Sequence, residues 1–131
     1  MVVHKGIAAP TSWANLKDPD FKDKVALPSP SFAASALGML GYFAAQPGYG
    51  MAYYKDLKQN GAVQVNAPAD TLTGVEQGTY AAGFTLANAA YTDQQKGSPI
   101  EVVWPQPGAI ANYAPSGLTT KNDLCPLAGQ F

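Results

Sequence analysis

Charged side chains are scarce in this sequence. Asp, Glu, Lys and Arg make up 13% of its 131 residues, whereas about 25% is usual for a globular domain. The eight basic and nine acidic residues nearly cancel, and no basic run could follow a phosphate backbone, which argues against nucleic acid as a partner. Three kinds of protein fit such an uncharged surface: a lobe whose broad face is covered by a second lobe, an adhesin, and a subunit of an oligomer.

Cysteine and histidine occur once each, which leaves little for catalysis or metal binding. Cys125 cannot form an internal disulfide and has no activating base near it in the sequence. His4 lies far along the chain from any cluster of cysteine or acidic residues that could complete a metal site. Glycine-rich nucleotide loops and the Gly-x-Ser-x-Gly elbow of serine hydrolases are also absent. We therefore expect a binding protein rather than an enzyme, without cofactor or metal.

Long hydrophobic runs are missing as well. No window of ~18 apolar residues predicts a membrane span, and residues 1–5 lack the basic-then-apolar pattern of a signal peptide. The chain has about the length of one domain. It opens inside a β-prone segment and stops at 128–131 in what resembles the first turn of a helix. We expect residues 1–131 to form a single domain that is a fragment of a longer protein.

Short apolar segments alternate with helix-prone segments along the chain. The apolar stretch after Ser31 predicts a helix with Ser31 as its N-cap, and a later helix begins at Asp70 or, from the capping-box spacing of Thr73 and Glu76, further on. This alternation predicts an α/β fold with three layers, a mainly parallel sheet with helices on both faces. The predicted strands are a short one at 2–3 and those at 25–27, 63–65, 81–86 and 100–104. The predicted helices are a brief one that ends at Leu16, then 32–45, 51–59, the short one that stops at Gly78, and 88–95.

Small polar residues gather where predicted strands give way to helices. Capping alone accounts for Ser, Thr, Asp and Asn at any one such junction. The carboxyl ends of parallel strands meet at one edge of a sheet, where helix N-termini also converge. Several junctions at one edge therefore favour a site for an anion or a carboxylate-like group. The junctions are formed by Ser29 and Ser31, by Asp70 and Thr71, and by Thr85 and Asn88.

Three segments carry motifs that occur together in one protein family. They are Pro-Thr-Ser-Trp-Ala-Asn-Leu-Lys-Asp-Pro at 10–19, Phe-Lys-Asp-Lys-Val-Ala-Leu-Pro-Ser-Pro-Ser at 21–31, and Gly-Thr-Tyr-Ala-Ala-Gly-Phe-Thr at 78–85. In this order they resemble the second, C-terminal lobe of iron(III)/phosphonate/thiamine-type extracellular solute-binding proteins. That family commonly has Pro-Thr-Ser-Trp-x-Asp-Leu, then Lys-Gly-Lys-Ile-Ala-Leu-Pro-Asp-Pro-Ser-Ser-Ser-Gly, then Gly-Glu-Tyr-Ala-Val-Gly. The resemblance covers most of residues 1–131.

The resemblance implies a lobe with the type 2 periplasmic-binding-protein fold, whose first lobe is missing from this chain. It also implies capture of a small-molecule solute in an interlobe cleft for an ABC importer, with the transporter permease as a partner. The full-length protein would be periplasmic or otherwise extracytoplasmic. We expect the isolated lobe to self-associate through the apolar rim around Phe32 and Tyr113. The residues expected to bind the solute are Ser29, Ser31, Phe32, Ala33, Asp70, Thr71, Thr85, Asn88 and Tyr113.

Departures from the family motifs bear on the solute. The family's Ser-Ser-Ser-Gly is here Ser-Phe-Ala-Ala at 31–34, and the adjacent tyrosines that the ferric branch carries after the strand near Thr85 are replaced by Leu-Ala-Asn-Ala-Ala at 86–90. Fe(III) needs oxygen anions that these segments do not supply. We therefore expect a small anionic or zwitterionic solute, phosphonate-like or carboxylate-like. A lobe for ferric ion or a ferric chelate, and a cell-surface adhesion domain without a small ligand, stay open as alternatives.

Overall fold

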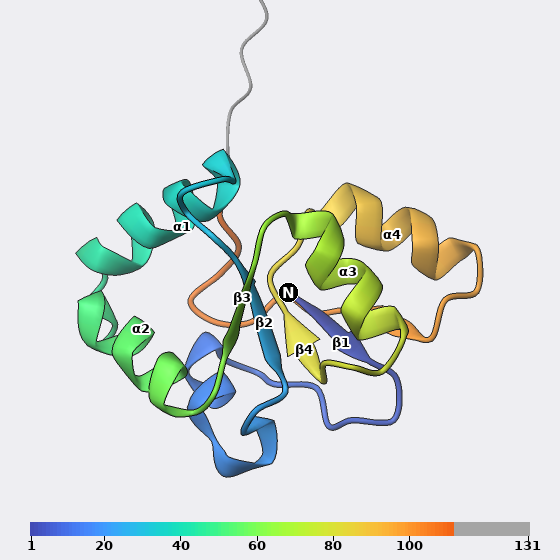
Figure 1. Ribbon diagram of the computed structural model, residues 1–131, viewed down its shortest axis with the longest axis horizontal. Helices are drawn as coiled ribbons and strands as arrows, with labels where there is room; N and C mark the ends of the chain where they lie inside the picture. Colours follow the sequence, from blue (N-terminus) through green and yellow to red (C-terminus); the bar gives the residue numbers. More distant parts are fainter. Residues whose placement is uncertain (112–131) are drawn as a thin grey trace, which may run out of the picture.

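A five-stranded sheet forms the centre of the molecule in the computed structural model, which describes residues 1–111 (Figure 1). β2 pairs in parallel with both β3 and β4, whereas β1 lies antiparallel between β4 and β5. Four strands therefore run in one direction and β1 runs against them. The strands, in the order β3-β2-β4-β1-β5, are β1 Val2–His4, β2 Val25–Pro28, β3 Val63–Val65, β4 Ala82–Gly83 and β5 Ile100–Val102.

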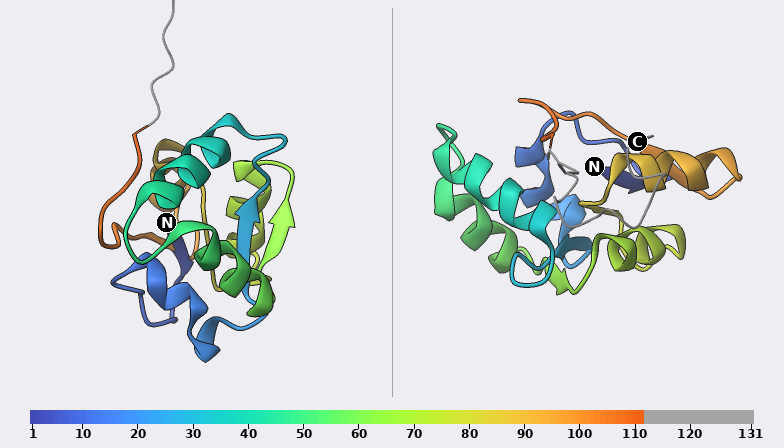
Figure 2. Two further views of the ribbon diagram at one scale, coloured as in Figure 1. Left: turned by 90° about the vertical axis from the view of Figure 1, so that its left-hand side faces the viewer. Right: turned by 90° about the horizontal axis from the view of Figure 1, so that it is seen from above.

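Helices cover both faces of the sheet. Successive side chains of a strand point to opposite faces, and Val2 and Val3 of β1 accordingly belong to two separate buried clusters. The cluster of Val2 packs under α3 and α4, and the cluster of Val3 packs under η1, α1 and α2, which lie on the other side of the strands (Figures 1 and 2). The helices are η1 Trp13–Lys17, η2 Pro19–Phe21, α1 Ala34–Ala45, α2 Gly50–Gln59, α3 Pro68–Glu76 and α4 Ala87–Gln95.

The predicted three-layer α/β fold is thus confirmed, with a sheet that is mainly parallel. The strand at 63–65 has the predicted bounds, and the helix predicted for 51–59 begins one residue earlier. The strands predicted for 81–86 and 100–104 are shorter than expected. β4 ends at Gly83 and β5 ends at Val102, because the chain leaves the sheet there to form the wall of a hollow that is described below.

Two predicted helix starts are wrong. The N–H of Ser31 donates to Ser29 Oγ over 3.3 Å in a turn, so Ser31 does not cap α1, whose N-cap is Ala33. The third helix begins at Pro68, because proline is accommodated in the first turn of a helix. Thr73 therefore lies within α3 and cannot open it.

The core on the α1 and α2 side is built from aromatic rings. The rings of Trp13 and Phe43 meet edge to face with centroids 5.6 Å apart, and Phe43 also contacts Tyr53 at 5.3 Å. The buried hydroxyl of Tyr53 donates to the carbonyl oxygen of Trp13 over 2.7 Å. Because this bond satisfies the one polar group of the side chain, the ring can be buried at little cost. These contacts hold η1 against α1 and α2.

No helix among residues 1–111 is both long enough and apolar enough to cross a membrane.

Candidate functional site

A hollow of about 140 Å³ opens at one edge of the sheet. The carboxyl ends of β2, β3, β4 and β5 meet at this edge, since these strands run in the same direction. The first turns of α1, α3 and α4 begin there as well, in the upper part of Figure 1 and toward the viewer in the right panel of Figure 2. In an α/β sheet this edge is the usual place for a ligand.

Aromatic side chains lie deepest in the hollow. Trp13 is 3% exposed, and its ring meets that of Phe84 edge to face with centroids 4.8 Å apart. The indole N–H of Trp13 donates to the carbonyl oxygen of Gly108 over 2.8 Å. This bond holds Gly108, in the segment after β5, beside Trp13 at the hollow. Both rings line the hollow and offer it apolar surface, because the one polar group of the pair is already bonded.

Trp104 forms part of the outer wall. It follows β5, lines the hollow and remains 53% exposed. Its indole N–H donates to the hydroxyl of Tyr91 on α4 over 2.9 Å, and the two rings are tilted by 35°. Such a contact holds the orientation of the indole while its surface stays open to solvent. Aliphatic and thioether side chains complete the apolar wall, namely Met1, Pro28, Met39, Pro68, Leu86, Ala87, Ala109 and Ile110.

Few polar side chains line the hollow. Thr85 Oγ1 donates to the carbonyl oxygen of Pro68 over 2.8 Å and ties the end of β4 to the start of α3. The hydroxyl of Ser35, in the first turn of α1, lines the hollow and has no hydrogen-bond partner among residues 1–111.

Backbone N–H groups supply further donors at this edge. α1 and α4 begin at Ala34 and Ala87 without a side-chain cap from the described residues. In the same part of the chain, the N–H groups of 34–36 and 87–89 have no acceptor. Such groups carry the partial positive charge of a helix N-terminus, which favours an anion.

Charged side chains are almost absent from the edge. The segments around the hollow are 28–36, 66–71, 84–90 and 103–111, and Asp70 is the one ionisable residue in them. Its carboxylate accepts the N–H of Ala67 over 2.9 Å and so belongs to the cap of α3. Met1 also lines the hollow, and its amino group donates to the carbonyl oxygen of Val103 over 3.2 Å. Burial lowers the pKa of this amino group to about 6. A solute at this edge therefore meets few charged groups.

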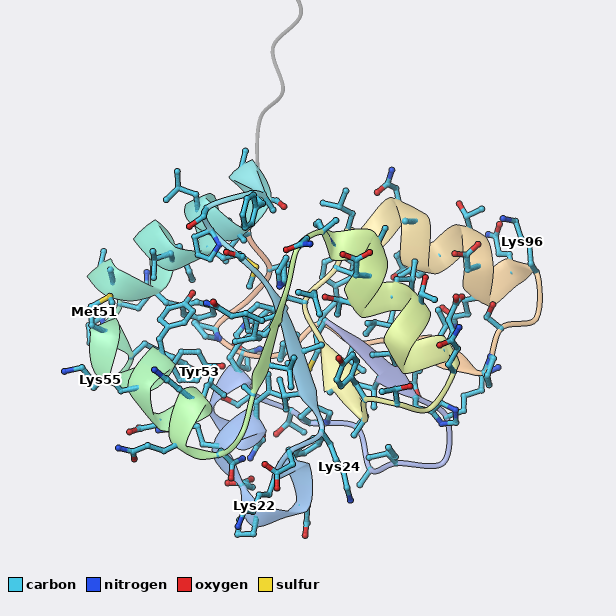
Figure 3. The ribbon with its side chains drawn as sticks, in the orientation of Figure 1. Lys22, Lys24, Met51, Tyr53, Lys55 and Lys96 are labelled. Atoms are coloured by element: carbon cyan, nitrogen blue, oxygen red, sulfur yellow. The ribbon has the colours of Figure 1, made fainter. Side chains whose placement is uncertain are left out.

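The lysines labelled in Figure 3 lie elsewhere on the molecule. Lys22 and Lys24 are at the opposite edge of the sheet, Lys55 is on α2, and Lys96 is at the end of α4. These four lysines thus lie away from the hollow.

The structure brings most of the predicted site residues that it describes to this edge, but of these only Thr85 lines the hollow. Ser29 and Ser31 lie in the turn between β2 and α1, beside Ala33, which is buried, and Phe32, which is 76% exposed. Asn88 is an exposed residue in the first turn of α4. Binding of a solute by these residues stays a prediction.

Two predicted residues, Thr71 and Asp70, have surroundings other than the hollow. Thr71 is fully buried in α3, where its methyl group packs against Gly83 of β4. The carboxylate of Asp70 caps its own helix, as described above. Tyr113 lies outside the described residues.

Sequence reasoning missed most of the lining. Phe84, Trp104, Met39 and Ser35 were not predicted to face a site, although Trp104 ends one predicted strand and Phe84 lies in the second half of another. That position was the available signal, because strand ends in parallel sheets face the ligand edge.

The described part of the chain contains no group of three or more His, Cys, Asp or Glu side chains that could hold a metal ion.

The mainly parallel sheet, its two helix layers and a hollow at the carboxyl edge define an α/β domain of the kind that commonly binds ligands at this edge. The sequence pattern of bacterial extracellular solute-binding proteins matches residues 1–129. The chain belongs to this family. The family supports solute capture as the class of function and an extracytoplasmic location.

Two solved structures have similar folds. One is described as a two-component system protein that mediates signal transduction, with a TM-score of 0.65 and 24% identity over 79% of this chain. The other is the periplasmic binding protein P5PA, with a TM-score of 0.69 and 26% identity over 77% of this chain. The chain spans about a third of the length of each, 36% and 32% respectively. A comparison with curated proteins found no match.

Proposed function

We propose that this chain is one lobe of a bilobed type 2 binding protein, which captures a small anionic or zwitterionic solute outside the cytoplasm for an ABC importer. Family membership and the similar fold of a periplasmic binding protein support solute capture. Because the chain spans about a third of that protein's length, the proposal includes a second lobe from the same protein. The importer permease is the proposed recipient of the solute.

The observation that carries the proposal is the hollow at the carboxyl edge of the sheet. It opens where the first turns of α1 and α4 begin, and both helices leave backbone N–H groups without acceptors among residues 1–111. Three N–H groups at each start, together with the hydroxyl of Ser35, form a neutral set of donors. An acidic group accepts hydrogen bonds from such a set without a charged side chain as counter-ion.

The low charge of the edge supports a second lobe. Phe32 is 76% exposed beside the hollow, and Leu86 at its wall is 46% exposed. A second lobe that closed over this edge would bury these side chains and exclude water from the solute. The charged residues that we find at the opposite edge would stay in solvent.

The alternatives have less support. A ferric site needs several oxygen anions, and Asp70 is the one ionisable residue in the segments around the hollow. Its carboxylate is already used in the cap of α3. An adhesion domain has no need of a hollow at the ligand edge, and family membership points to solutes instead.

A thermal-unfolding screen of the full-length protein tests the proposal. The probes are methylphosphonate, 2-aminoethylphosphonate and succinate, with spermidine as a cationic control and ferric citrate for the alternative. A ligand that binds the native state alone stabilises it by about 2.7 kcal/mol at a concentration one hundred times its Kd. We expect at least one acid to raise the melting temperature. Stabilisation by ferric citrate alone would favour the ferric alternative, and none by any probe would contradict the proposal.

A further inference from the structure

Most polar side chains around the hollow already have a hydrogen-bond partner within the protein. Both indole N–H groups are bonded, that of Trp13 to Gly108 and that of Trp104 to Tyr91. The hydroxyl of Thr85 is bonded to Pro68. Within residues 1–111, only the hydroxyl of Ser35 lines the hollow without a partner. Most of the surface that a bound solute would touch is therefore hydrocarbon.

The size of the hollow matches one ring. Its volume is about 140 Å³. An apolar cavity of roughly 150 Å³ lined by Leu, Ile and Phe side chains holds one benzene molecule. A single-ring group fits this space, whereas a short aliphatic acid such as acetate would leave most of the apolar wall without a contact.

Trp104 is placed to receive such a ring. It is 53% exposed although it lines the hollow, so an apolar surface of the largest side chain faces solvent there. The bond from its indole N–H to Tyr91 holds the orientation of the indole before any solute arrives. A wall that is already ordered loses less conformational entropy on binding than a mobile one.

We propose that the solute carries a flat apolar ring, which enters the hollow and packs against Trp104. This rests on the proposed function and names the solute class within it, namely ring-bearing organic acids such as aryl phosphonates or aromatic carboxylates. The ring occupies the apolar part of the hollow, between Trp104 and the side chains of Met39 and Phe84. Its acidic group points out of that apolar part, toward the donors at the rim.

Calorimetric titration of the full-length protein with two matched pairs of acids tests the inference. The pairs are phenylphosphonate with methylphosphonate, and benzoate with acetate. We expect the ring-bearing member of at least one pair to bind about tenfold tighter, from aromatic contact and apolar burial. Trp104→Ala should remove this advantage and leave the affinity for the ringless acid within about twofold. Trp104→Phe, which keeps a ring, should retain most of the advantage.

The outcomes separate the two proposals. Equal binding of both members of each pair would overturn the ring inference and leave solute capture standing. A ring advantage that Trp104→Ala does not reduce would also overturn it. Absence of binding by all four acids, together with no stabilisation in the thermal screen, would overturn the proposed function and this inference with it. Far-UV circular dichroism of both variants checks that the half-exposed Trp104 is not required for folding.

Discussion

Thr85 Oγ1 donates a 2.8 Å hydrogen bond to the carbonyl oxygen of Pro68. The two residues line the same hollow, Thr85 in the segment that follows β4 and Pro68 at the start of α3. The bond therefore joins two elements at the proposed binding edge. It also uses the hydroxyl of Thr85, the one predicted site residue within 1–111 that lines the hollow.

Replacement of Thr85 by valine should lower the free energy of unfolding by about 1 kcal/mol, because the near-isosteric side chain leaves the Pro68 carbonyl without its donor. Urea denaturation measures this. Thr92→Val is the matched control, since that hydroxyl donates to the carbonyl of Asn88 in the exposed part of α4. An equal loss in both variants would show that the contact between β4 and α3 contributes nothing of its own.

Gly83→Ala should destabilise the protein by about 1 to 3 kcal/mol, the usual cost of overpacking a core. An added methyl group would overlap the Thr71 methyl group and lie 2.7 Å from the carbonyl oxygen of Ala26. Gly41→Ala is the control, because it lies in α1 with open space around it and should stabilise by up to about 1 kcal/mol through helix propensity. Opposite signs in urea denaturation are expected; a stable Gly83→Ala variant would mean that α3 does not pack closely on β4.

The neighbouring tyrosines of α2 should respond differently to loss of the hydroxyl. Tyr53→Phe removes the bond to the Trp13 carbonyl and should cost about 1 kcal/mol. The hydroxyl of Tyr54 is buried without a partner among residues 1–111, so Tyr54→Phe should be neutral or stabilising. Chemical denaturation of both variants at pH 7 makes the comparison. If Tyr54→Phe lost as much stability as Tyr53→Phe, its hydroxyl would have a partner that this account lacks.

Stability should fall as the pH rises above about 10. Burial raises the pKa of Tyr54 from its ordinary value of 10.0 to about 12, and burial also raises the pKa of Tyr53. Between pH 10 and 12 the unfolded chain loses these protons while the native state keeps them, so the stability present below pH 10 is lost progressively. Denaturation series from pH 8 to 11 should show a shallower decline for Tyr54→Phe than for the wild type. Parallel declines would contradict the raised pKa of Tyr54.

The isolated chain should bind solute with a Kd above roughly 0.1 mM. If the solute binds in a cleft between two lobes, one lobe alone provides only part of the contacts. It should also self-associate through the exposed apolar residues near the hollow. Phe32→Ser should weaken this association in sedimentation experiments, whereas Met51→Ser, at an equally apolar position on the far side of α1 and α2, should not (Figure 3). Micromolar binding by a strictly monomeric chain would show that it is a complete receptor.

Much of the fold could be predicted from local patterns. Two neighbouring strands follow from local patterns, namely the apolar run at 25–27 and the alternation of Val63 and Val65. Both patterns involve only residues close together in the sequence, so they can be recognised without knowledge of the tertiary structure. The cap of α1 could not be predicted, since the turn at Ser29 competes for the same residues as a cap at Ser31. The burial of Thr71 could not be predicted either. Thr71 packs against Gly83, and this contact depends on the position of β4 in the sheet.

The candidate site was harder to predict than the fold. Polar residues at strand ends were found because parallel topology collects them at one edge. The hollow itself is formed by η1, by the first turn of α1 and by the chain after β5, which are far apart in sequence. In the sequence, Trp104 cannot be distinguished from a tryptophan of the core. Only the tertiary structure shows that Trp104 is half exposed while Trp13 is buried.

The central claim, that solute binds in the hollow, is tested most directly by filling it. Ala87 lines the hollow at the start of α4, and Ala52 is exposed on α2, away from that edge. The full-length protein, with either Ala87→Phe or Ala52→Phe, would be titrated calorimetrically with the acid that stabilises it most in the thermal screen. We predict that Ala87→Phe weakens binding at least about tenfold, which is about 1.4 kcal/mol, while Ala52→Phe leaves it within about twofold. Equal affinities for the two variants would place the solute somewhere other than this hollow and contradict the account.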